Sequence, residues 1–454
     1  MSINSILNTG ARGMAVSTAQ TQVASNNVSN AATVGYTRRT LVAYPENALS
    51  RAESAKRVQE PFIQKRVLDA QSTSSEATAY KASVDVLDTV FSDDDGNVGP
   101  ALDNFQAAIN GLNSRPDDVA LRQQVLTEAT NLSRAFNNAN DTLQQARLDG
   151  NTRIQDSIRQ VNQKLHEISK LSGQISTSEV SGVEASALRD QRDLLISQVA
   201  ERVPVTAVDQ GNGQVSLTLN GQHSLVAMDG KVTELTTDTD DSGAMRISRI
   251  SAGASVDVTA SVGSGTVGAQ LKTFSGPLSQ AKQRLDQLAY DVANAYNTVH
   301  AGGVGLDGAS GRNLFTPPAG VADAARNLAV SADVADAPRN LAAAADAAGL
   351  PSDNRNALAL AQVSAQKNLA GGQSINDVMS GLVGFAGSVV QSAGTNQNFA
   401  SGALEQVQAL RDNVSGVSSD EEMVELMKFQ RAYQASLRVI QTADEMYGDL
   451  LALR

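Results

Sequence analysis

The chain has 454 residues, of which 41% are hydrophobic but only 4% aromatic, and it contains no tryptophan. We expect several domains, because a chain this long can bury more than one core, and so few large side chains favour elongated helical packing. The net charge of −12 argues against a nucleic-acid-binding protein, since neutralising phosphates requires a basic surface. The absence of cysteine excludes disulfides, thiolate nucleophiles and sulfur metal ligands.

The sequence shows neither a cleaved secretion signal nor a membrane span. The first residues, MSINSILNTGARG, lack the basic leader and continuous apolar core of a Sec signal. The longest apolar candidate, residues 381–390, is interrupted by glycine and is shorter than the roughly 18 residues of a membrane helix. We therefore expect no membrane association, and we expect any secretion to use a route without a cleaved signal.

Residues 1–30 are predicted to form a helix whose surface is mostly small and polar. Its candidate interface residues, spread among Ala, Ser, Thr and Gly, are Ile3, Ile6, Leu7 and Met14. Small side chains allow a second backbone to approach closely. We therefore expect this helix to pair with another one.

An asparagine-rich run, SNNVSNAATVGYTR, follows at residues 25–38. Asparagine and glycine tolerate positive φ, and asparagine side chains cap free backbone groups, so the run predicts a helix end and a turn. The residues expected to shape this turn are Asn26, Asn27, Asn30, Gly35 and Tyr36. An ordinary helix stop is the simplest interpretation of the pattern alone.

The middle of the chain has two different hydrophobic periods. Residues 61–203 and 276–416 repeat their apolar positions at helical spacing. Within 204–275, as far as about residue 271, apolar and polar residues alternate, and Asn-Gly and Asp-Gly turns separate short strands. We therefore predict an antiparallel β insert within a helical domain. The Ala- and Asp-rich stretch 319–349 is predicted to be a surface loop with short helices.

Residues 419–454 predict one long amphipathic helix. Ser419 is expected to cap it, with Glu422 at the third helical position completing a capping box. Its apolar residues recur every three or four positions and define one seam, formed by Met423, Leu426, Tyr433, Leu437, Ile440, Tyr447 and Leu451.

That seam needs a partner helix. Burying its side chains contributes about 10 to 20 kcal/mol gross, whereas ordering the backbone of about 35 residues costs roughly 35 to 70 kcal/mol. The helix predicted at residues 1–30 is the candidate partner within the chain.

The predicted fold class is therefore mainly α, as an elongated multidomain protein. We expect residues 1–60 and 417–454 to pair as a terminal coiled coil. Residues 61–203 and 276–416 would form the helical middle domain, and residues 204–275 the small, outward-facing antiparallel β domain.

Three patterns resemble ligand sites, but the sequence favours none of them. The run GSGTVG at 263–268 has dinucleotide-binding spacing, yet Gly276-Pro277 would end the required helix too early. The acidic run 238–243 begins like a calcium loop but has Arg249 at the twelfth position. The histidines lie far apart along the chain, at His166, His223 and His300. We predict no catalytic residue, cofactor or metal.

Both ends of the chain resemble the flagellar rod, hook and hook-associated protein family. The run at residues 25–38 resembles that family's SNN-ANA-T-GY-R signature. The closing segments MKFQRAYQAS at 427–436 and VIQTADEM at 439–446 are similar to the members that join hook to filament. The resemblance covers both ends well and the middle only loosely.

This resemblance implies a secreted structural protein of the bacterial flagellum, located at the hook-filament junction and exported by the flagellar type III pathway. It implies ring-like self-assembly, contacts with the hook protein and the next junction protein, and an export chaperone at the C-terminal region. A hook protein or filament-type subunit is the alternative. A nucleotide-dependent enzyme, based on residues 263–268, is a remote one.

Overall fold

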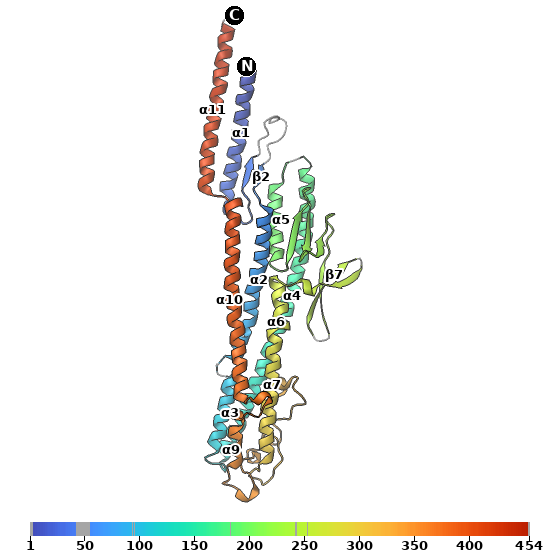
Figure 1. The fold of residues 1–454 in the computed structure, drawn as a ribbon, viewed down its shortest axis with the longest axis vertical. Helices are drawn as coiled ribbons and strands as arrows, with labels where there is room; N and C mark the ends of the chain where they lie inside the picture. The colour runs from blue at the N-terminus through green and yellow to red at the C-terminus, as the bar shows by residue number, and fades with distance from the viewer. Residues whose placement is uncertain are drawn as a thin grey trace. The chain divides into compact units, whose positions relative to one another are not determined.

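The computed structural model describes residues 3–41, 55–92, 94, 96–181, 183–240, 243–251 and 253–452. Its fold is mainly α, with small antiparallel sheets, as predicted (Figure 1). The longer helices are α1 (Ile3–Asn30), α2 (Pro61–Phe91), α3 (Val98–Leu112), α4 (Val119–Ser178), α5 (Ser186–Ala200), α6 (Gly265–Ser275), α7 (Pro277–Gly302), α10 (Ile375–Ser415) and α11 (Ser419–Ala452). Two shorter ones are α8 (Ala324–Asn327) and α9 (Arg355–Gln362).

Two compact units make up the chain, each assembled from distant segments. The first comprises Met1–Glu76, Gln155–Gly268 and Asn398–Arg454, and the second comprises Ala77–Ile154 and Ala269–Gln397. The predicted division into three parts stays a prediction. The terminal pair falls in the first unit, and so does the predicted β insert as far as Gly268.

The described strands all belong to the first unit and pair only antiparallel. They are β1 (Arg39–Leu41), β2 (Ala55–Arg57), β3 (Val205–Asp209), β4 (Val215–Leu219), β5 (His223–Val226), β6 (Leu235–Thr239), β7 (Met245–Ser251) and β8 (Ala254–Asp257). They form the sheets β1-β2, β3-β4-β5 and β6-β7-β8. The C-terminal half of α4 supports the β6-β7-β8 sheet, because Asn162 exchanges two hydrogen bonds with the backbone of Leu235, at 2.8 and 3.0 Å.

The alternating pattern does not continue as strand to residue 271, so that part of the strand prediction is wrong. The strands end at Asp257, whose carboxylate accepts a hydrogen bond of 2.8 Å from the Thr259 N–H and turns the chain. Val258 and Val262 are buried in this turn rather than in a strand. The alternation of apolar and polar residues in the sequence therefore mimicked a strand here, and the next long element is α6.

The described residues of the second unit form a hydrophobic core among α2, α3, α4, α7, α9 and α10. Phe105, Tyr296 and Phe315 form its aromatic centre, with ring centroids 5.0 to 6.3 Å apart in tilted or edge-on arrangements. Each of these three rings is fully buried. Burial also raises the pKa of Tyr296.

The stretch 319–349 lies partly in this core, which corrects its prediction as a surface loop. Its buried apolar residues are Ala324, Ala325, Leu328, Val334, Leu341, Ala342, Ala343 and Ala344. Alanine is small enough for the backbone to approach α4 and α7 closely. Asn137 and Asp286 then satisfy that backbone, because Asn137 donates to the carbonyl of Ala325 at 2.8 Å and Asp286 accepts from its N–H at 3.1 Å.

His300 is fully buried and bonded at both ring nitrogens. Its Nδ1 donates to the carbonyl of Arg312 at 2.7 Å, and its Nε2 accepts from the N–H of Ala342 at 2.9 Å. This pairing fits the neutral ring only. Burial accordingly lowers the pKa of His300 below its ordinary value.

We expect His300 to make the second unit sensitive to acid. Unfolded chains bind the proton below the ordinary histidine pKa of about 6.5, whereas the folded chain resists it, so stability falls as the pH drops through that value. His300→Gln should lose about 1 to 3 kcal/mol of stability at neutral pH but fall less steeply toward about pH 5. Urea unfolding followed by circular dichroism measures both quantities. Equal slopes for the two proteins would contradict the assignment.

Candidate functional site

The two ends of the chain pair as antiparallel helices, α1 against α11 (Figure 1). Gly10 lies beside Ile440, while Asn27 bonds Glu422, so the contacts run in opposite directions along the two helices. A Cβ on Gly10 would lie only 2.5 Å from Ile440 Cγ1 and 3.3 Å from the carbonyl oxygen of Ser436. Glycine therefore sets how closely the two helices approach.

The predicted seam on α11 divides between two environments. Leu426 and Ile440 are half-buried. Met423, Tyr433, Leu437 and Tyr447 are 53, 41, 39 and 51% exposed, and the side chain of Leu451 lies outside the described residues. Sequence reasoning missed Phe429, Ser436 and Ala443, of which Ala443 is fully buried. Ser436 and Ala443 were missed because the search considered only large apolar side chains.

The same bias affected the first helix. The four predicted residues, Ile3, Ile6, Leu7 and Met14, are half-buried. The fully buried positions are Gly10, Ser17, Ala24 and Asn27. Three of these small residues recur at intervals of seven, which is coiled-coil spacing and could have identified the row.

The start of α11 differs from its prediction by one residue. Ser418 is the cap, because its Oγ accepts from the N–H of Glu421 at 3.4 Å. Its carbonyl accepts from the N–H of Glu422 at 3.0 Å. Glu422 therefore does not complete a capping box with Ser419. Its carboxylate instead bonds outside α11, to Asn27 and Arg38.

Asn27 is the centre of a buried polar cluster at the base of the terminal pair. Its Nδ2 donates to Glu422 Oε2 at 3.0 Å and to the carbonyl of Arg39 at 2.9 Å. Its Oδ1 accepts from the hydroxyl of Tyr36 at 2.9 Å and from the N–H of Arg39 at 3.1 Å. All four hydrogen-bonding sites of the amide are occupied. Arg38 completes the cluster, because its Nε donates to Glu422 at 2.7 Å.

The remaining signature residues shape the turn that carries this cluster. Asn30 Nδ2 donates to the carbonyl of Asn26 at 2.8 Å, which closes the end of α1, and the side chain of Asn26 is exposed. Gly35 has a φ of +81°. A Cβ added to it would lie 3.6 Å from the Cβ of Leu194. Tyr36 lies under the guanidinium of Arg39, 4.8 Å from its ring centroid, and burial raises the pKa of Tyr36.

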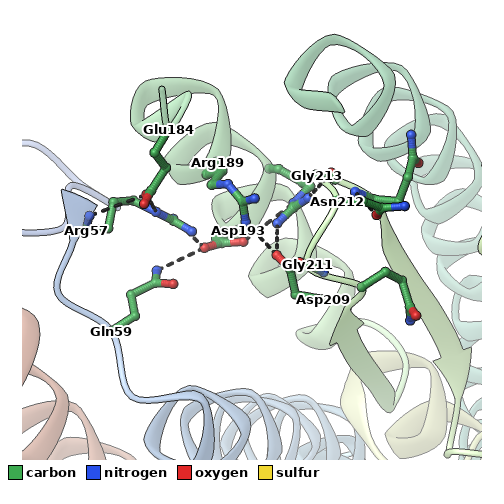
Figure 2. A network of polar contacts seen from close by, with 12 residues as sticks. Arg57, Gln59, Glu184, Arg189, Asp193, Asp209, Gly211, Asn212 and Gly213 are labelled. Carbon is green, nitrogen blue, oxygen red and sulfur yellow. Dashed lines mark hydrogen bonds and ion pairs between the residues drawn. The ribbon is translucent and has the colours of Figure 1, made fainter. Parts of the chain in front are cut away.

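A second polar cluster attaches the β1-β2 hairpin to α5 (Figure 2). Arg57 is nearly buried and donates to Asp193 at 2.7 Å, Asp190 at 3.1 Å and Glu184 at 3.2 Å. Asp190 also accepts from Arg39 at 3.2 Å, so it joins this cluster to the signature turn. Burial alone would lower the pKa of Arg57, but its bonds to Asp193 and Asp190 hold that pKa above its ordinary value.

A neighbouring side of α5 holds the β3-β4 hairpin (Figure 2). Arg192 donates to the carbonyl of Gly213 at 2.8 Å and to Asp209 at 3.0 Å, and Arg189 donates to Asp209 at 2.6 Å. Despite partial burial, the bond from the Gly211 N–H and the two arginines lower the pKa of Asp209. These charged groups pair with each other, so they hold elements together.

The dinucleotide-like run at 263–268 has no free site for a phosphate. The N–H groups of Thr266 and Val267, at the start of α6, donate to the carbonyls of Glu201 and Arg202 at 2.9 and 3.1 Å. A Cβ on Gly265 would lie 2.5 Å from Arg202. Its glycines thus allow close packing against the end of α5. The alternative of a nucleotide-dependent enzyme rested on this run, and the run has a packing role instead.

The acidic run and the histidines also make structural contacts, and among the latter His166 bonds Glu234 at 2.7 Å and His223 bonds Ser261 at 3.2 Å. In the acidic run, Asp240 Oδ1 accepts from the N–H of Ala244 at 3.0 Å and Asp238 pairs with Arg246 at 2.7 Å, while Ser242 lies outside the described residues. Among the described residues, no group of three or more His, Asp or Glu side chains could hold a metal. Within the same residues, no helix combines the length and apolar character needed to cross a membrane.

Comparison with protein families assigns both the middle and the end of the chain. The family model for the "Flagellar hook-associated protein FlgK helical domain" matches residues 84–315, about half of the chain. The chain belongs to the FlgK family. The family model for the "Flagellar basal body rod FlgEFG protein C-terminal" matches residues 409–453, which include α11.

Relatives of this family match along their whole length. Flagellar hook-associated protein 1 of Bacillus subtilis is 26% identical, over 98% of this chain and 97% of its own. The Escherichia coli protein of the same name is 24% identical, over all of both chains. The solved flagellar hook junction protein FlgK from Burkholderia pseudomallei has the same fold, with a TM-score of 0.68 at 16% identity over 77% of this chain and all of its own.

Gly10→Ala should loosen the terminal pair, whereas Gly448→Ala should not. Both changes raise helix propensity by about 1 kcal/mol, and an added Cβ on Gly448 meets no described atom within 4 Å. On Gly10 it meets Ile440, so we expect a net loss of about 1 to 3 kcal/mol. Amide hydrogen exchange in α1 and α11 measures the difference. Equal protection in the two variants would show that the close approach is unimportant.

Asn27→Asp should disrupt the polar cluster, and Asn26→Asp is its matched control. The first change removes both donated hydrogen bonds and places a second carboxylate beside Glu422, so we expect a loss of about 2 to 4 kcal/mol. The second introduces the same charge on an exposed neighbour, with an expected effect within about 0.5 kcal/mol. Thermal and urea unfolding provide the comparison. Similar losses in both variants would refute a special role for Asn27.

Proposed function

We propose that the chain is a structural axial protein of the bacterial flagellum, an adaptor that assembles at the distal end of the hook and connects it to the filament. The observation that carries the proposal is the pairing of the two chain ends through small residues, which leaves large apolar side chains of α11 exposed. Membership of the FlgK family supports the same role. The relatives are named as hook-associated proteins and a hook junction protein.

The role requires no chemistry from the chain. The buried charged groups around Asn27 and Arg57 pair with other groups of the chain, and these pairs connect its elements to one another. We therefore assign the protein no enzymatic activity, cofactor or metal. Its function would depend on geometry alone, with one surface contacting the hook and another contacting the filament side.

The proposed partners are other axial proteins. Copies of the chain would form a ring-like assembly, with the hook protein on one side and the next junction protein on the other. Met423, Leu437 and Tyr447 are exposed apolar residues that such contacts would cover. An export chaperone would cover the C-terminal region before assembly. Export would use the flagellar type III pathway without a cleaved signal, and the mature location would be outside the cell.

The three-part organisation is part of this proposal. The terminal pair, 1–60 and 417–454, would lie nearest the axis of the assembly. The helical middle domain would surround it, and the β insert at 204–275 would lie outermost. The paired helices α1 and α11 and the separate sheets formed by β3 to β8 support this assignment of parts.

Deleting the gene tests the role directly. Cells without the protein should build complete hooks but carry no filaments, because the filament would lack its attachment site, and unattached filament protein should accumulate in the medium. Electron microscopy of the cell surface measures the outcome. A hook protein would instead be needed for the hook itself, so absent hooks would favour that alternative, and intact filaments would exclude both roles.

A further inference from the structure

The helix α11 has apolar side chains on both sides of the row that contacts α1. That row includes Leu426, Ser436, Ile440 and Ala443. In a helix, a residue three positions earlier lies about 60° to one side of a given residue, and one three positions later lies about 60° to the other. Large apolar residues occupy both kinds of position.

The first of these surfaces contains Met423 and Leu437, three residues before Leu426 and Ile440, and we call it the Met423 flank. The second contains Val439 and Met446, three residues after Ser436 and Ala443, and we call it the Val439 flank. Val439 and Met446 are 41 and 47% exposed, comparable with the residues of the Met423 flank.

Two-stranded coiled coils usually carry charged residues at these flanking positions, where Glu and Lys keep the edge of the seam in water. Apolar residues on both flanks indicate a helix that packs against more than one neighbour. Within the described part of the chain, the buried and half-buried side chains of α11 lie in the row between the flanks, where Tyr433 and Tyr447 are 41 and 51% exposed. The flanks are therefore continuous with an existing helix interface but lack a partner.

From Arg431 onward the side of α11 that faces away from α1 is charged, whereas nearer the start of the helix Val424 and Met427 are exposed apolar residues on that side. Arg431, Arg438 and Glu445 follow one line at intervals of seven residues, and all three are exposed. None of them forms an ion pair with the described residues of the chain. Unpaired charges of both signs suit contact with water. This line separates the two flanks, so one flat partner could not cover both.

We propose that each flank contacts a different copy of this chain, with the Met423 flank of one copy packed against the Val439 flank of the next. The inference rests on the proposed self-assembly and adds which surfaces meet. A contact between unlike surfaces can repeat around an axis, whereas a contact between like surfaces ends at a pair. Two distinct apolar flanks on one helix are what such a repeating contact requires.

The small size of each flank has a consequence for free chains. Two half-exposed side chains per flank cannot offset the freedom that two separate molecules lose on association. The contact therefore forms only where neighbouring copies are already held in place. It belongs to the assembled flagellum and requires no stable dimer in solution.

Cysteine cross-linking in assembled flagella tests the contact, because the natural chain has no cysteine. Four double variants combine the flanks at different axial offsets, Met423→Cys or Leu437→Cys with Val439→Cys or Met446→Cys. At least one should give a ladder of dimers, trimers and higher species with a short bis-maleimide. The matched control, Arg438→Cys, lies between the flanks on the charged line and should stay monomeric.

The single variants decide between the two geometries. Leu437→Cys or Val439→Cys alone should give no cross-link, so dimers from either one would overturn the proposal, because they would show like flanks meeting. The absence of a ladder in all four double variants would overturn it as well. Filaments that remain attached in those cells would show that the junction role survives this failure.

Charge substitution provides a second, independent readout. Leu437→Asp should reduce the amount of protein incorporated into flagella at least tenfold, whereas the neighbouring Arg438→Asp should change it less than twofold. Equal incorporation of the two variants would overturn the proposal. Hydrogen exchange of each purified variant establishes that α1 and α11 still pair.

Discussion

The hydrogen bond between Asn27 and Glu422 joins residues that are 395 positions apart, and the first unit depends on the meeting of the two chain ends that this bond marks. Beside it, Arg38 donates both to Glu422 and, through its backbone N–H, to the carbonyl of Ser415. The base of the terminal pair is thus fixed to the end of α10 and the start of α11. Neither terminal helix could be placed correctly by its own sequence, because each provides only half of this cluster.

Two kinds of contact hold α1 against α11. Along the helices, Gly10, Ser17 and Ala24 allow close approach, but their small side chains offer few atoms for contact. At the base, Asn27 has a donor or acceptor for every hydrogen-bonding site, and any shift would leave buried polar groups unpaired. Close approach therefore comes from the small residues, and the polar cluster determines the register.

The sequence predicted the broad fold well and the packing of small or polar residues poorly. Helical spacing located α11, the mainly helical middle and the strands β3 to β7, because these patterns are local. The stretch containing Ala324 and Ala325 was misassigned to the surface, since its burial depends on Asn137 and Asp286 from distant helices. Glu422 was assigned to a cap for the same reason, because its true partners lie on the other end of the chain.

In the first unit several polar side chains are buried and several large apolar side chains are exposed, which is the reverse of the usual distribution. The two observations have one explanation. Asn27, Glu422 and Arg57 are buried because they specify contacts within one chain, where a wrong register must be excluded. Met423, Leu437, Val439 and Met446 are exposed because the groups that would cover them are not part of that chain. An adaptor must fold before it meets its neighbours and still retain surfaces for them. The polar cluster at the base of the terminal pair specifies how the chain folds, and the exposed apolar residues of α11 remain available for neighbouring molecules.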